Sequence, residues 1–505
     1  MSDLPAGWSP GPALARRAGY RSLRSAANDD HSETERRICQ PRPPLLLEHM
    51  ASPFHVHLVA PSNEDTTHIK PLWAATLAAH TPDDVELTFR DDGLDPIDLA
   101  RESDAPDLVG ISVTTKTAVR AYAIADSYRA RGSRVVLGGI HVTALPAEAG
   151  EHADAVVVGE SEWLWQDVVQ DARCGELGRT RSRARRPFYR RDEYPPLVGL
   201  PLPRRSLMKS IRYVPFDVVQ TTRGCPFRCE FCSVSAYNGT KLRFRPVPEI
   251  IAELETCSRR ILFSDDNVMI HPQHSRELFE AMVPLRKSWV GEASLAALRR
   301  VEDVAGMARS GCRAIAIGFE SISNDALRYV GKHQNRPQEY REVVRCLSDH
   351  GIAVWGSFIF GLDGDSPDAF ERTVEFCIDA KVTVAVFALL TPYPGTPLYQ
   401  RLKAAGRITR DGWWLSDEHD QDAPFYRPTT MSREALRAGW VRAWRAMYSW
   451  SSIQRRYDFG MKHSWVQNVA YWPLNLLMHE VAEKKIAGGD HAWRKHRTLD
   501  LPLGF

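Results

Sequence analysis

Between residues 54 and 171, short apolar runs alternate with longer stretches in which apolar residues recur with helical spacing. The apolar runs predict five strands, at residues 54–60, 85–89, 108–113, 134–137 and 155–158. The amphipathic stretches between them, such as 69–79 and 117–131, predict helices. Strands separated by helices of this length favour a parallel, doubly wound α/β sheet of the flavodoxin or Rossmann type. Ligands of such sheets bind at the carboxyl ends of the strands.

A second alternating pattern extends from residue 214 to residue 390 and repeats six times. Its apolar runs predict strands at residues 217–221, 260–263, 289–292, 314–317, 354–359 and 384–389. Six strand–helix repeats favour an open, partial (β/α)6 barrel rather than a closed barrel of eight. In βα barrels the reacting groups lie at the carboxyl ends of the strands.

Three further segments flank these two domains, which we place at residues 51–172 and 214–410. Residues 1–50 are rich in Arg, Ser, Pro and Ala and predict a disordered extension; alternatively, translation begins at Met50. Residues 173–213 are basic and proline-rich and predict a linker. Residues 411–505 are rich in aromatic residues and predict a helical region. Its stripe of Trp440, Trp444 and Tyr448 indicates either packing against the barrel or a pocket for a flat substrate.

Composition narrows the class of protein. The 505 residues include 65 Lys and Arg against 63 Asp and Glu, so the net charge of +2 gives no support for nucleic-acid binding. No apolar run approaches the length of a membrane span, and the chain begins without a secretory pattern. The nine cysteines do not form a disulfide framework, which favours a reducing, cytoplasmic location. We expect a monomer or a weak oligomer.

Three of the cysteines, Cys225, Cys229 and Cys232, lie within eight residues, directly after the first barrel strand. Thiolates in such a run hold iron–sulfur clusters. A cube of four irons would receive three ligands from this triplet and keep one iron open for a ligand that is not protein. The alternatives are three buried cysteines or a zinc site, but a zinc site would need a second ligand pair at typical spacing, and none follows.

The triplet, with Phe231 before its third cysteine, resembles the CxxxCxxC signature of radical S-adenosylmethionine (SAM) enzymes. The resemblance implies a [4Fe-4S] cluster whose open iron is chelated by SAM, and cleavage of SAM to a 5′-deoxyadenosyl radical by one electron. An external reductant, flavodoxin or ferredoxin, would supply that electron. From about residue 52 to residue 450, the chain is similar to the subgroup that carries an N-terminal cobalamin-binding domain, which includes the class B radical SAM methyltransferases.

The resemblance also implies a cobalamin site at three strand ends of the first domain. Its candidate residues follow the third, fourth and fifth strands: Ser112, Thr114, Thr115, Gly138, Gly139, His141, Gly159 and Glu160. In the subgroup, the hydroxyl-bearing loop and the glycine loop enclose the nucleotide tail of cobalamin. The DxHxxG motif, whose histidine binds cobalt from below, is absent, so a degenerate domain that no longer binds cobalamin remains an alternative.

Further cofactor contacts are implied at the strand ends of the barrel. After its second strand, Asp265, Asp266 and Asn267 occupy the place where the family commonly has GGE, which holds the amino group of SAM. After the fourth strand, Gly318, Glu320 and Ser321 would reach the ribose and the methionyl part. After the fifth strand, Gly361 would line the adenine side.

The combined prediction is a cobalamin-dependent radical SAM C-methyltransferase that acts on an unactivated carbon of a small natural-product or lipid-like substrate. Methyl transfer to a substrate radical requires no catalytic acid or base, and the sequence shows no obvious pair of this kind. A cobalamin-dependent radical cyclase or oxidoreductase would use the same cofactors and is the main alternative. An iron–sulfur electron carrier or a cobalamin-binding regulator would explain only one of the two domains. A methylthiotransferase would need a second set of cysteines, which the N-terminal half lacks.

Overall fold

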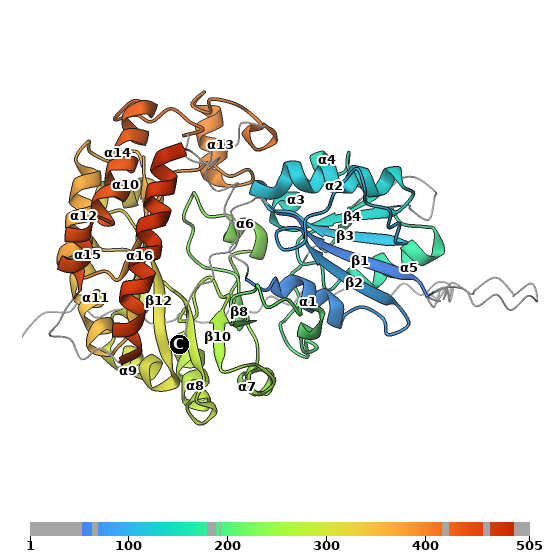
Figure 1. The fold of residues 1–505 in the computed structure, drawn as a ribbon, viewed down its shortest axis with the longest axis horizontal. Coiled ribbons are helices and arrows are strands. Elements are labelled where there is room, and N and C mark those ends of the chain that lie inside the picture. Colours follow the sequence, from blue (N-terminus) through green and yellow to red (C-terminus); the bar gives the residue numbers. More distant parts are fainter. Residues whose placement is uncertain are drawn as a thin grey trace, which may run out of the picture. The chain divides into compact units, whose positions relative to one another are not determined.

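The computed structural model describes residues 53–62, 69–178, 188–191, 193–416, 424–457 and 465–488. The predicted N-terminal extension and the arginine run of the predicted linker lie outside these residues. Residues from Ala51 onward form one unit, and both predicted sheets lie within it (Figure 1).

The first sheet is parallel, with strand order β2-β1-β3-β4-β5-β6. Its strands are β1 His55–Ala60, β2 Glu86–Asp91, β3 Leu108–Ser112, β4 Arg134–Gly138, β5 Ala155–Val158 and β6 Phe188–Arg190. Five of them were predicted, whereas β6 falls inside the predicted linker. This strand was missed because three residues with little burial at the sheet edge leave no apolar run.

Helices cover both faces of this sheet. The bounds are α1 Leu72–Ala79, α2 Ala118–Ala130, α3 Ile140–Ala144, α4 Pro146–Ala149 and α5 Trp165–Cys174, with a short 3₁₀ turn η1 at Thr115–Thr117. One core places α2 against β3 and β4, and a separate core places α1 and α5 against the opposite face. The sheet is therefore doubly wound, and its strand ends point to the loops where the cobalamin site is predicted.

The second sheet contains six parallel strands in chain order, with β7 and β14 at its edges. The strands are β7 Asp217–Val219, β10 Arg260–Phe263, β11 Ser288–Ala293, β12 Cys312–Glu320, β13 Ala353–Phe360 and β14 Val384–Leu389. The helices on its outer side are α7 Val247–Thr256, α8 Pro272–Met282, α9 Val301–Ser310, α11 Tyr340–Asp349 and α12 Ala369–Asp379. This is the open six-stranded barrel that the sequence predicts. Helix α10 Asn324–Tyr329 packs in a separate apolar cluster, which also contacts Phe231.

The inner face of the barrel stays accessible, unlike the outer face. On β11, Trp289, Gly291 and Ala293 are buried against the helices, while Glu292 between them is exposed. On β13 the neighbouring inward position, Trp355, is 36% exposed. Because side chains alternate across a strand, these exposed residues all face the barrel interior. The interior therefore has room for ligands.

A two-stranded antiparallel hairpin was not anticipated. It consists of β8 Thr222–Arg223 and β9 Arg243–Phe244, and it encloses the cysteine loop and the short helix α6 Val234–Asn238. Strands of two residues are too short to give a periodic pattern in the sequence. The hairpin closes the ends of the cysteine loop onto each other.

The C-terminal helices α14 Arg433–Met447, α15 Trp450–Arg456 and α16 Trp465–Gly488 complete the described chain. The indole N–H groups of Trp440 and Trp444 donate to the carbonyl of Phe387, at 2.8 and 3.1 Å, and the Tyr448 hydroxyl donates to the carbonyl of Ala385 at 2.6 Å. The aromatic stripe is therefore core packing against the edge strand β14, and not a substrate pocket.

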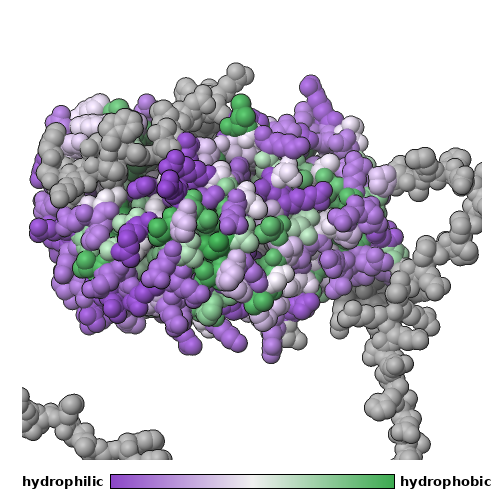
Figure 2. All heavy atoms as spheres, turned by 90° about the horizontal axis from the view of Figure 1, so that it is seen from below, coloured by the Kyte–Doolittle hydropathy of each residue, from purple (hydrophilic) through white to green (hydrophobic). Residues whose placement is uncertain are grey.

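The outer surface of the described residues is mixed in character. Figure 2 shows hydrophilic side chains over most of one face, with apolar patches between them. Within the described ranges, no helix combines the length and the apolar character that a membrane span needs.

Candidate active site

The cysteine loop begins at Gly224, where the backbone adopts a positive φ of 87°. A Cβ atom here would collide with the carbonyl of Lys241, so glycine is required for the turn. Farther along, the Glu230 N–H donates to the carbonyl of Val330 at 2.9 Å, and the Glu230 carbonyl accepts from the N–H of Leu398 at 2.9 Å. The loop is thus fastened to two segments that lie far away in the sequence.

The three thiols of the triplet lie close enough to influence one another. Cys229 is buried, and the other two are partly buried. Burial, together with negative charge on Cys229, Asp266 and Cys225, raises the pKa of Cys232 to about 11. Burial and the charges on Cys229 and Asp266 also raise the pKa of Cys225. Three thiolates in this arrangement would repel one another, and bound iron ions would offset that repulsion.

The donor set fits a cube better than a single ion. Among the described residues, no three His, Cys, Asp or Glu side chains are grouped as ligands of one metal ion. A four-iron cube does not require such convergence, since it takes each thiolate on a different iron. The triplet fits the cluster in ligand type and in number.

Lys332 places a cation beside the triplet, and sequence reasoning missed it. Its ammonium pairs with the carboxylate of Glu320 and lies 5.7 Å from the centre of the Phe231 ring. Burial alone would lower the pKa of Lys332, but Glu320 and the Cys229 thiolate outweigh this effect and raise the pKa. The side chain is therefore a positive charge next to the cluster ligands. No local motif marks this lysine, because it is brought to the site by the loop after α10.

Gly318 makes room for the Glu320–Lys332 pair. A Cβ at residue 318 would meet the carboxylate of Glu320 and lie 2.8 Å from the Lys332 ammonium. Glu320 itself has a positive φ of 60°, at an irregularity in the pairing of β12 with β13. Strained residues of this kind concentrate at functional sites. Gly318 and Glu320, both predicted as cofactor contacts, are thus found together beside the cysteines.

The same region contains a buried acceptor without a donor. The Asn335 amide nitrogen donates to the carbonyls of Gly318 and Phe319, at 2.8 and 3.0 Å, while its oxygen has no partner among the described residues. An unpaired buried oxygen costs about 1–3 kcal/mol. A ligand that brings N–H or O–H groups would remove this cost, as the amino acid or ribose part of SAM would.

We expect Gly318→Ala to weaken SAM binding about tenfold, or ~1.4 kcal/mol, because the added methyl group displaces the ion pair. Equilibrium dialysis of SAM against the cluster-loaded protein measures this. Gly306→Ala is the matched control, since a Cβ there approaches only the end of the Arg309 side chain, at 4.0 Å. Equal SAM affinity in both variants would contradict a role for the pair.

The three polar residues after β10 have different surroundings. The buried Asp265 carboxylate accepts hydrogen bonds from both the N–H and the hydroxyl groups of Thr221 and Thr222, at 2.5–3.1 Å. The Asn267 amide donates to the Ser294 hydroxyl at 2.8 Å. These two side chains fasten the loop to its neighbours and are not turned toward the cysteines.

Asp266 is the one of the three that remains available. Among the side chains that the structure describes, the Asn238 amide donates a hydrogen bond to its carboxylate, at 3.4 Å. Burial raises the pKa of Asp266 to about 6. Its charge also acts on Cys225 and Cys232. Asp266 is therefore the residue of this loop that can hold the SAM amino group by a charge-assisted hydrogen bond.

Glu292, on the inner face of β11, is a second acid that sequence reasoning missed. Glu292 is open to the barrel interior, but the surrounding walls desolvate its carboxylate and raise its pKa, as do the charges of Asp266 and Glu320, while Lys332 lowers it. Three carboxylates and one lysine thus lie near enough for their charges to act on one another. Such a group of charges attracts a cation, and SAM carries a sulfonium and an ammonium group. A charged residue at an inward position of an otherwise apolar strand was the available signal.

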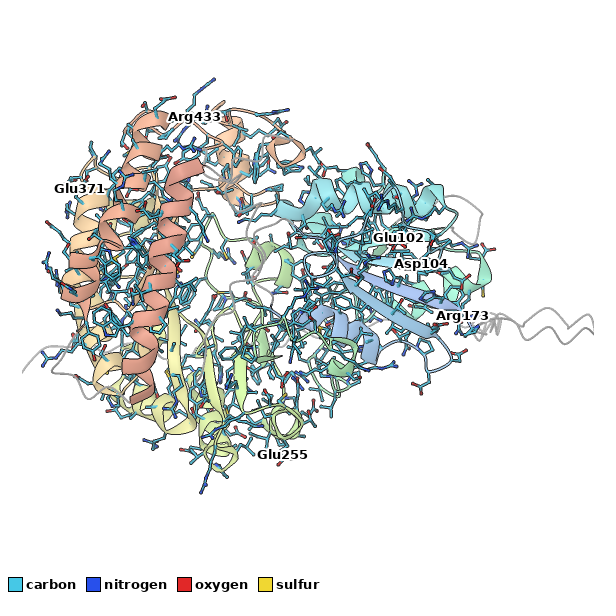
Figure 3. All side chains as sticks on the ribbon, viewed as in Figure 1. Glu102, Asp104, Arg173, Glu255, Glu371 and Arg433 are labelled. Carbon is cyan, nitrogen blue, oxygen red and sulfur yellow. The ribbon has the colours of Figure 1, made fainter. Side chains whose placement is uncertain are left out.

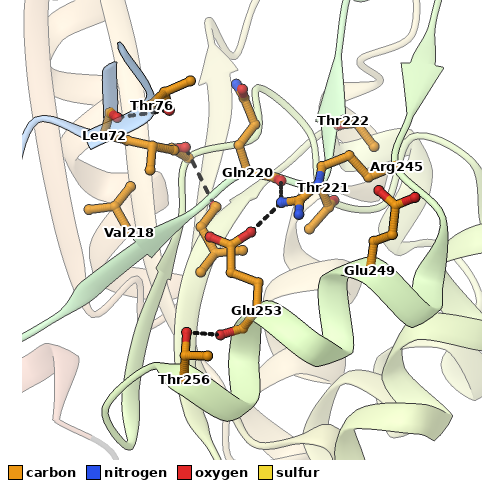
Figure 4. A network of polar contacts seen from close by, with 12 residues as sticks. Leu72, Thr76, Val218, Gln220, Thr221, Thr222, Arg245, Glu249, Glu253 and Thr256 are labelled. Carbon is orange, nitrogen blue, oxygen red and sulfur yellow. Dashed lines mark hydrogen bonds and ion pairs between the residues drawn. The ribbon is translucent and has the colours of Figure 1, made fainter. Parts of the chain in front are cut away.

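Behind the triplet, a buried ion pair supports the end of β7. The guanidinium of Arg245 donates to the carbonyl of Gln220 at 3.0 Å and to the carboxylate of Glu253 at 2.5 Å (Figure 4). Glu253 and Arg245 are both buried. This network fixes the backbone from which the cysteine loop departs.

A cavity of about 280 Å³ lies where the strand ends of the first sheet meet the barrel. The first domain contributes Gly110, Ser112, Gly138, Gly139, Glu160 and Glu162 among its lining residues, and the barrel domain contributes Gln220, Arg223, Tyr237, Asn238 and Ser264. The wall on the barrel side thus includes α6, which follows the third cysteine directly. The cavity can hold one arm of a molecule as large as cobalamin.

Glycines shape this cavity. Gly139 has a φ of 105°, and a Cβ there would lie 2.6 Å from the carbonyl of Val113. A Cβ on Gly110 would lie 2.9 Å from the Leu58 side chain. Side chains at these positions would collide with their surroundings, so the middle of β3 and the loop after β4 stay bare and a ligand can approach the backbone closely. This bare cradle fits the predicted tail of cobalamin.

Four buried charges join the two domains at the edge of the cavity. Arg223 pairs with Glu160 at 2.9 Å and also with Glu162, and Glu160 pairs in addition with Arg243. Burial would raise the pKa of Glu160, but Arg243 and Arg223 outweigh it and lower the pKa. Glu160, predicted as a cobalamin contact, therefore lines the cavity while its carboxylate is held by the barrel domain.

Other predicted cobalamin contacts lie away from the cavity lining. The buried His141 ring bonds to the Thr115 hydroxyl at 3.2 Å and to the Glu148 carboxylate at 3.0 Å, and Glu148 also accepts from the indole of Trp414. Thr114 forms a capping box at η1. The N–H of Gly159 donates to the Thr143 hydroxyl at 2.9 Å.

The predicted adenine side contains a second tight turn. Gly361 has a φ of 91°, and a Cβ there would overlap the Tyr426 hydroxyl. The buried Asp365 carboxylate accepts from the N–H groups of Gly361 and Leu362, both at 3.0 Å, and from the Ser321 hydroxyl at 3.4 Å. Gly361 and Ser321 are thereby held together at the ends of β13 and β12.

Comparisons with known proteins agree with this arrangement. Residues 64–168 match the B12 binding domain, residues 219–377 match the radical SAM superfamily, and residues 396–473 match a domain of unknown function, DUF4070. Bacteriochlorophyllide d C-12(1)-methyltransferase of Chlorobaculum tepidum is 31% identical over 75% of this chain and 81% of its own length. Hopanoid C-2 methylase of Rhodopseudomonas palustris is 27% identical over 66% of this chain and 62% of its own length.

A solved structure shares the fold. The radical SAM methyltransferase TsrM of Kitasatospora setae, with cobalamin and a [4Fe-4S] cluster bound, aligns with a TM-score of 0.63 and 18% identity. The alignment covers 86% of this chain and all of that chain. The two folds and the relatives define an enzyme whose cofactors are a [4Fe-4S] cluster, SAM and cobalamin. The chain belongs to the cobalamin-dependent radical SAM methyltransferases.

Proposed function

We propose that this enzyme transfers a methyl group to an unactivated carbon of a large, apolar, natural-product or lipid-like molecule. The observation that carries the proposal is the cavity wall formed by both domains, in which α6 connects the cobalamin side directly to Cys232. The relatives support the substrate class, since bacteriochlorophyllide and hopanoids are large ring systems with mainly apolar surfaces.

The residues divide the work between the two sites. Cys225, Cys229 and Cys232 hold the cluster, and Asp266 and Lys332 hold the two ends of the amino acid part of SAM. When bound, the cofactors supply one-electron cleavage of SAM and a transferable methyl group. The accessible inner face of the barrel admits the substrate, and the apolar packing around it excludes water.

The first test is the product balance. We expect the reconstituted enzyme, given SAM, cobalamin, a reductant and a chlorophyllide or hopanoid probe, to form 5′-deoxyadenosine and S-adenosylhomocysteine together with a methylated probe. Liquid chromatography with mass spectrometry measures all three. Formation of 5′-deoxyadenosine with a modified but unmethylated probe would instead indicate a radical cyclase or oxidoreductase.

We expect SAM to bind more tightly as the pH rises from 5 to 7. The pKa of Asp266 is about 6, and only its ionised form attracts the SAM ammonium group, so at pH 5 the affinity should be about tenfold lower than the plateau. Titration of the cluster-loaded protein with SAM at several pH values measures this. Asp266→Asn should bind SAM weakly with no pH dependence over this range, and a persistent dependence would show that another group is responsible.

Three further properties belong to the proposal. The cysteine ligands must stay reduced, which favours the cytoplasm, and no disulfide joins the described cysteines. A flavodoxin or ferredoxin is the proposed electron donor. We expect a monomer or a weak oligomer, which sedimentation of the holoenzyme would test.

A further inference from the structure

The cysteine loop reaches the protein surface on one side, where arginines outnumber carboxylates. We propose that this side is the docking surface for an acidic protein that carries a one-electron redox centre. The inference rests on the proposed function, because only a cluster held by the triplet would receive the electron. The surface, called here the electron-entry surface, consists of Arg228, Arg299, Arg328, His333, Gln334 and Arg336.

Arg228 is the centre of the electron-entry surface. It lies between Cys225 and Cys229 in the loop, and its side chain is exposed. In the part of the chain that the structure describes, no carboxylate is paired with its guanidinium. Backbone hydrogen bonds of Glu230 hold the loop in place, so the Arg228 side chain is not needed for the fold of the loop.

Backbone and side-chain contacts bring the loop after α10 and Arg299 close to Arg228. A Cβ on Gly331 would lie 3.1 Å from the carbonyl of Arg228, so the two backbones run close together, and the Gly331 N–H donates to the carbonyl of Arg328 at 3.1 Å. The guanidinium of Arg299 donates to the carbonyl of Gln334 at 3.0 Å. These contacts bring three separate segments of the chain together beside the cysteine loop.

Positive charge is concentrated on this surface. Its four arginines are accompanied by two carboxylates, since Asp325 pairs with Arg328, and Glu339 is shared by Arg299 and Arg336. The surface therefore carries a net charge of +2, which equals the net charge of the entire 505-residue chain. A local excess of this kind steers an acidic partner toward one face and raises its association rate.

The electron-entry surface also gives a short route to the cluster. The amide nitrogen of Gln334, which is only partly buried, lies 3.5 Å from the sulfur of Cys229. One side chain thus separates a docked carrier from a cluster ligand. Elsewhere, Phe231 packs against an apolar cluster, and Tyr237 and Asn238 of α6 line the cavity. The carrier loses one electron, the cluster gains that electron, and no bond or proton moves.

The test is the charge reversal Arg228→Glu with Arg336→Glu, assayed as 5′-deoxyadenosine formation by the cluster-loaded enzyme. With reduced flavodoxin as the donor, we expect the half-saturating flavodoxin concentration to rise about tenfold. With titanium(III) citrate, a small chemical donor that needs no docking, we expect the rate to stay within about twofold of the parent rate. Added salt should slow the parent enzyme with flavodoxin and leave the variant nearly unchanged.

Arg442→Glu is the matched control. Arg442 is 55% exposed and lies 3.2 Å from Glu371, whereas Arg336 is 58% exposed and lies 3.2 Å from Glu339. Glu371 lies on the helical side of the barrel, away from α6 (Figure 3). The control should behave as the parent enzyme with both donors.

Two outcomes would overturn the proposal. An unchanged flavodoxin dependence in the double variant would place electron entry elsewhere, and an equal loss with both donors would show that the arginines only support the loop. A parent enzyme that cleaves no SAM with titanium(III) citrate would contradict the proposed function itself, so the two failures can be told apart.

Discussion

Replacing Cys229 by Ala is expected to abolish the iron–sulfur cluster and, with it, all SAM cleavage. Cys229 is the most buried thiol of the triplet and lies near both Lys332 and Gln334. With two thiolates left, two irons of a cube would lack protein ligands, and the cluster would be lost during reconstitution. Iron and sulfide content, the visible absorbance of the cluster, and 5′-deoxyadenosine formation measure the effect.

Cys346→Ala is the control for this prediction. Cys346 lies on α11, outside the triplet, and is a free, partly buried thiol. Its replacement should leave cluster content and SAM cleavage at the parent level. Circular dichroism should show that both variants are folded, because the change in volume is small. If Cys229→Ala retained a full cluster and cleaved SAM, the assignment of the triplet would be wrong.

The sequence predicted the strands that carry the site more completely than the residues that contact the cofactors. Eleven of the strands that form the two main sheets lie where apolar periodicity places them, because each is a run of buried residues next to an amphipathic helix. The exceptions are β6 and the hairpin of β8 and β9. These elements are short and polar, and their pairing depends on tertiary neighbours rather than on a local pattern.

The polar residues after β10 show why contacts were harder to predict. Asp265 and Asp266 are adjacent and chemically identical. The carboxylate of Asp265 accepts hydrogen bonds from Thr221 and Thr222, whereas the charge of Asp266 acts on Cys225. Successive residues in extended backbone point in opposite directions, so a resemblance to the family motif could not separate them. The predicted cobalamin contact His141 likewise forms a hydrogen bond inside the protein, to the carboxylate of Glu148.

Lys332 and Asn335 illustrate a different limit. They reach the site from a loop that follows α10, and the contact of Gln334 with Cys229 joins this loop to a segment 105 positions earlier in the sequence. Periodicity and spacing describe neighbours along the chain. They carry no information about which loop of a barrel will lie against the cysteine loop.

The second large effect concerns the cobalamin cavity. We expect Ser112→Phe to prevent cobalamin loading while leaving the cluster intact. Ser112 ends β3 and lines the cavity of about 280 Å³. A phenyl ring in place of its hydroxyl would occupy the space beside Gly139, whose bare backbone leaves room for a ligand. The molar ratio of cobalamin to protein, measured by absorbance after gel filtration, should fall from near one to near zero.

This substitution separates the two cofactor sites because Ser112 and the triplet belong to different domains. Ser112→Phe should retain its iron content and still form 5′-deoxyadenosine, but it should form no methylated probe. Ala123→Phe, on the exposed side of α2 in the same domain, should load cobalamin normally. Full cobalamin loading by Ser112→Phe would mean that the cofactor binds outside this cavity. A methylated probe without bound cobalamin would mean that the methyl group reaches the substrate by another route.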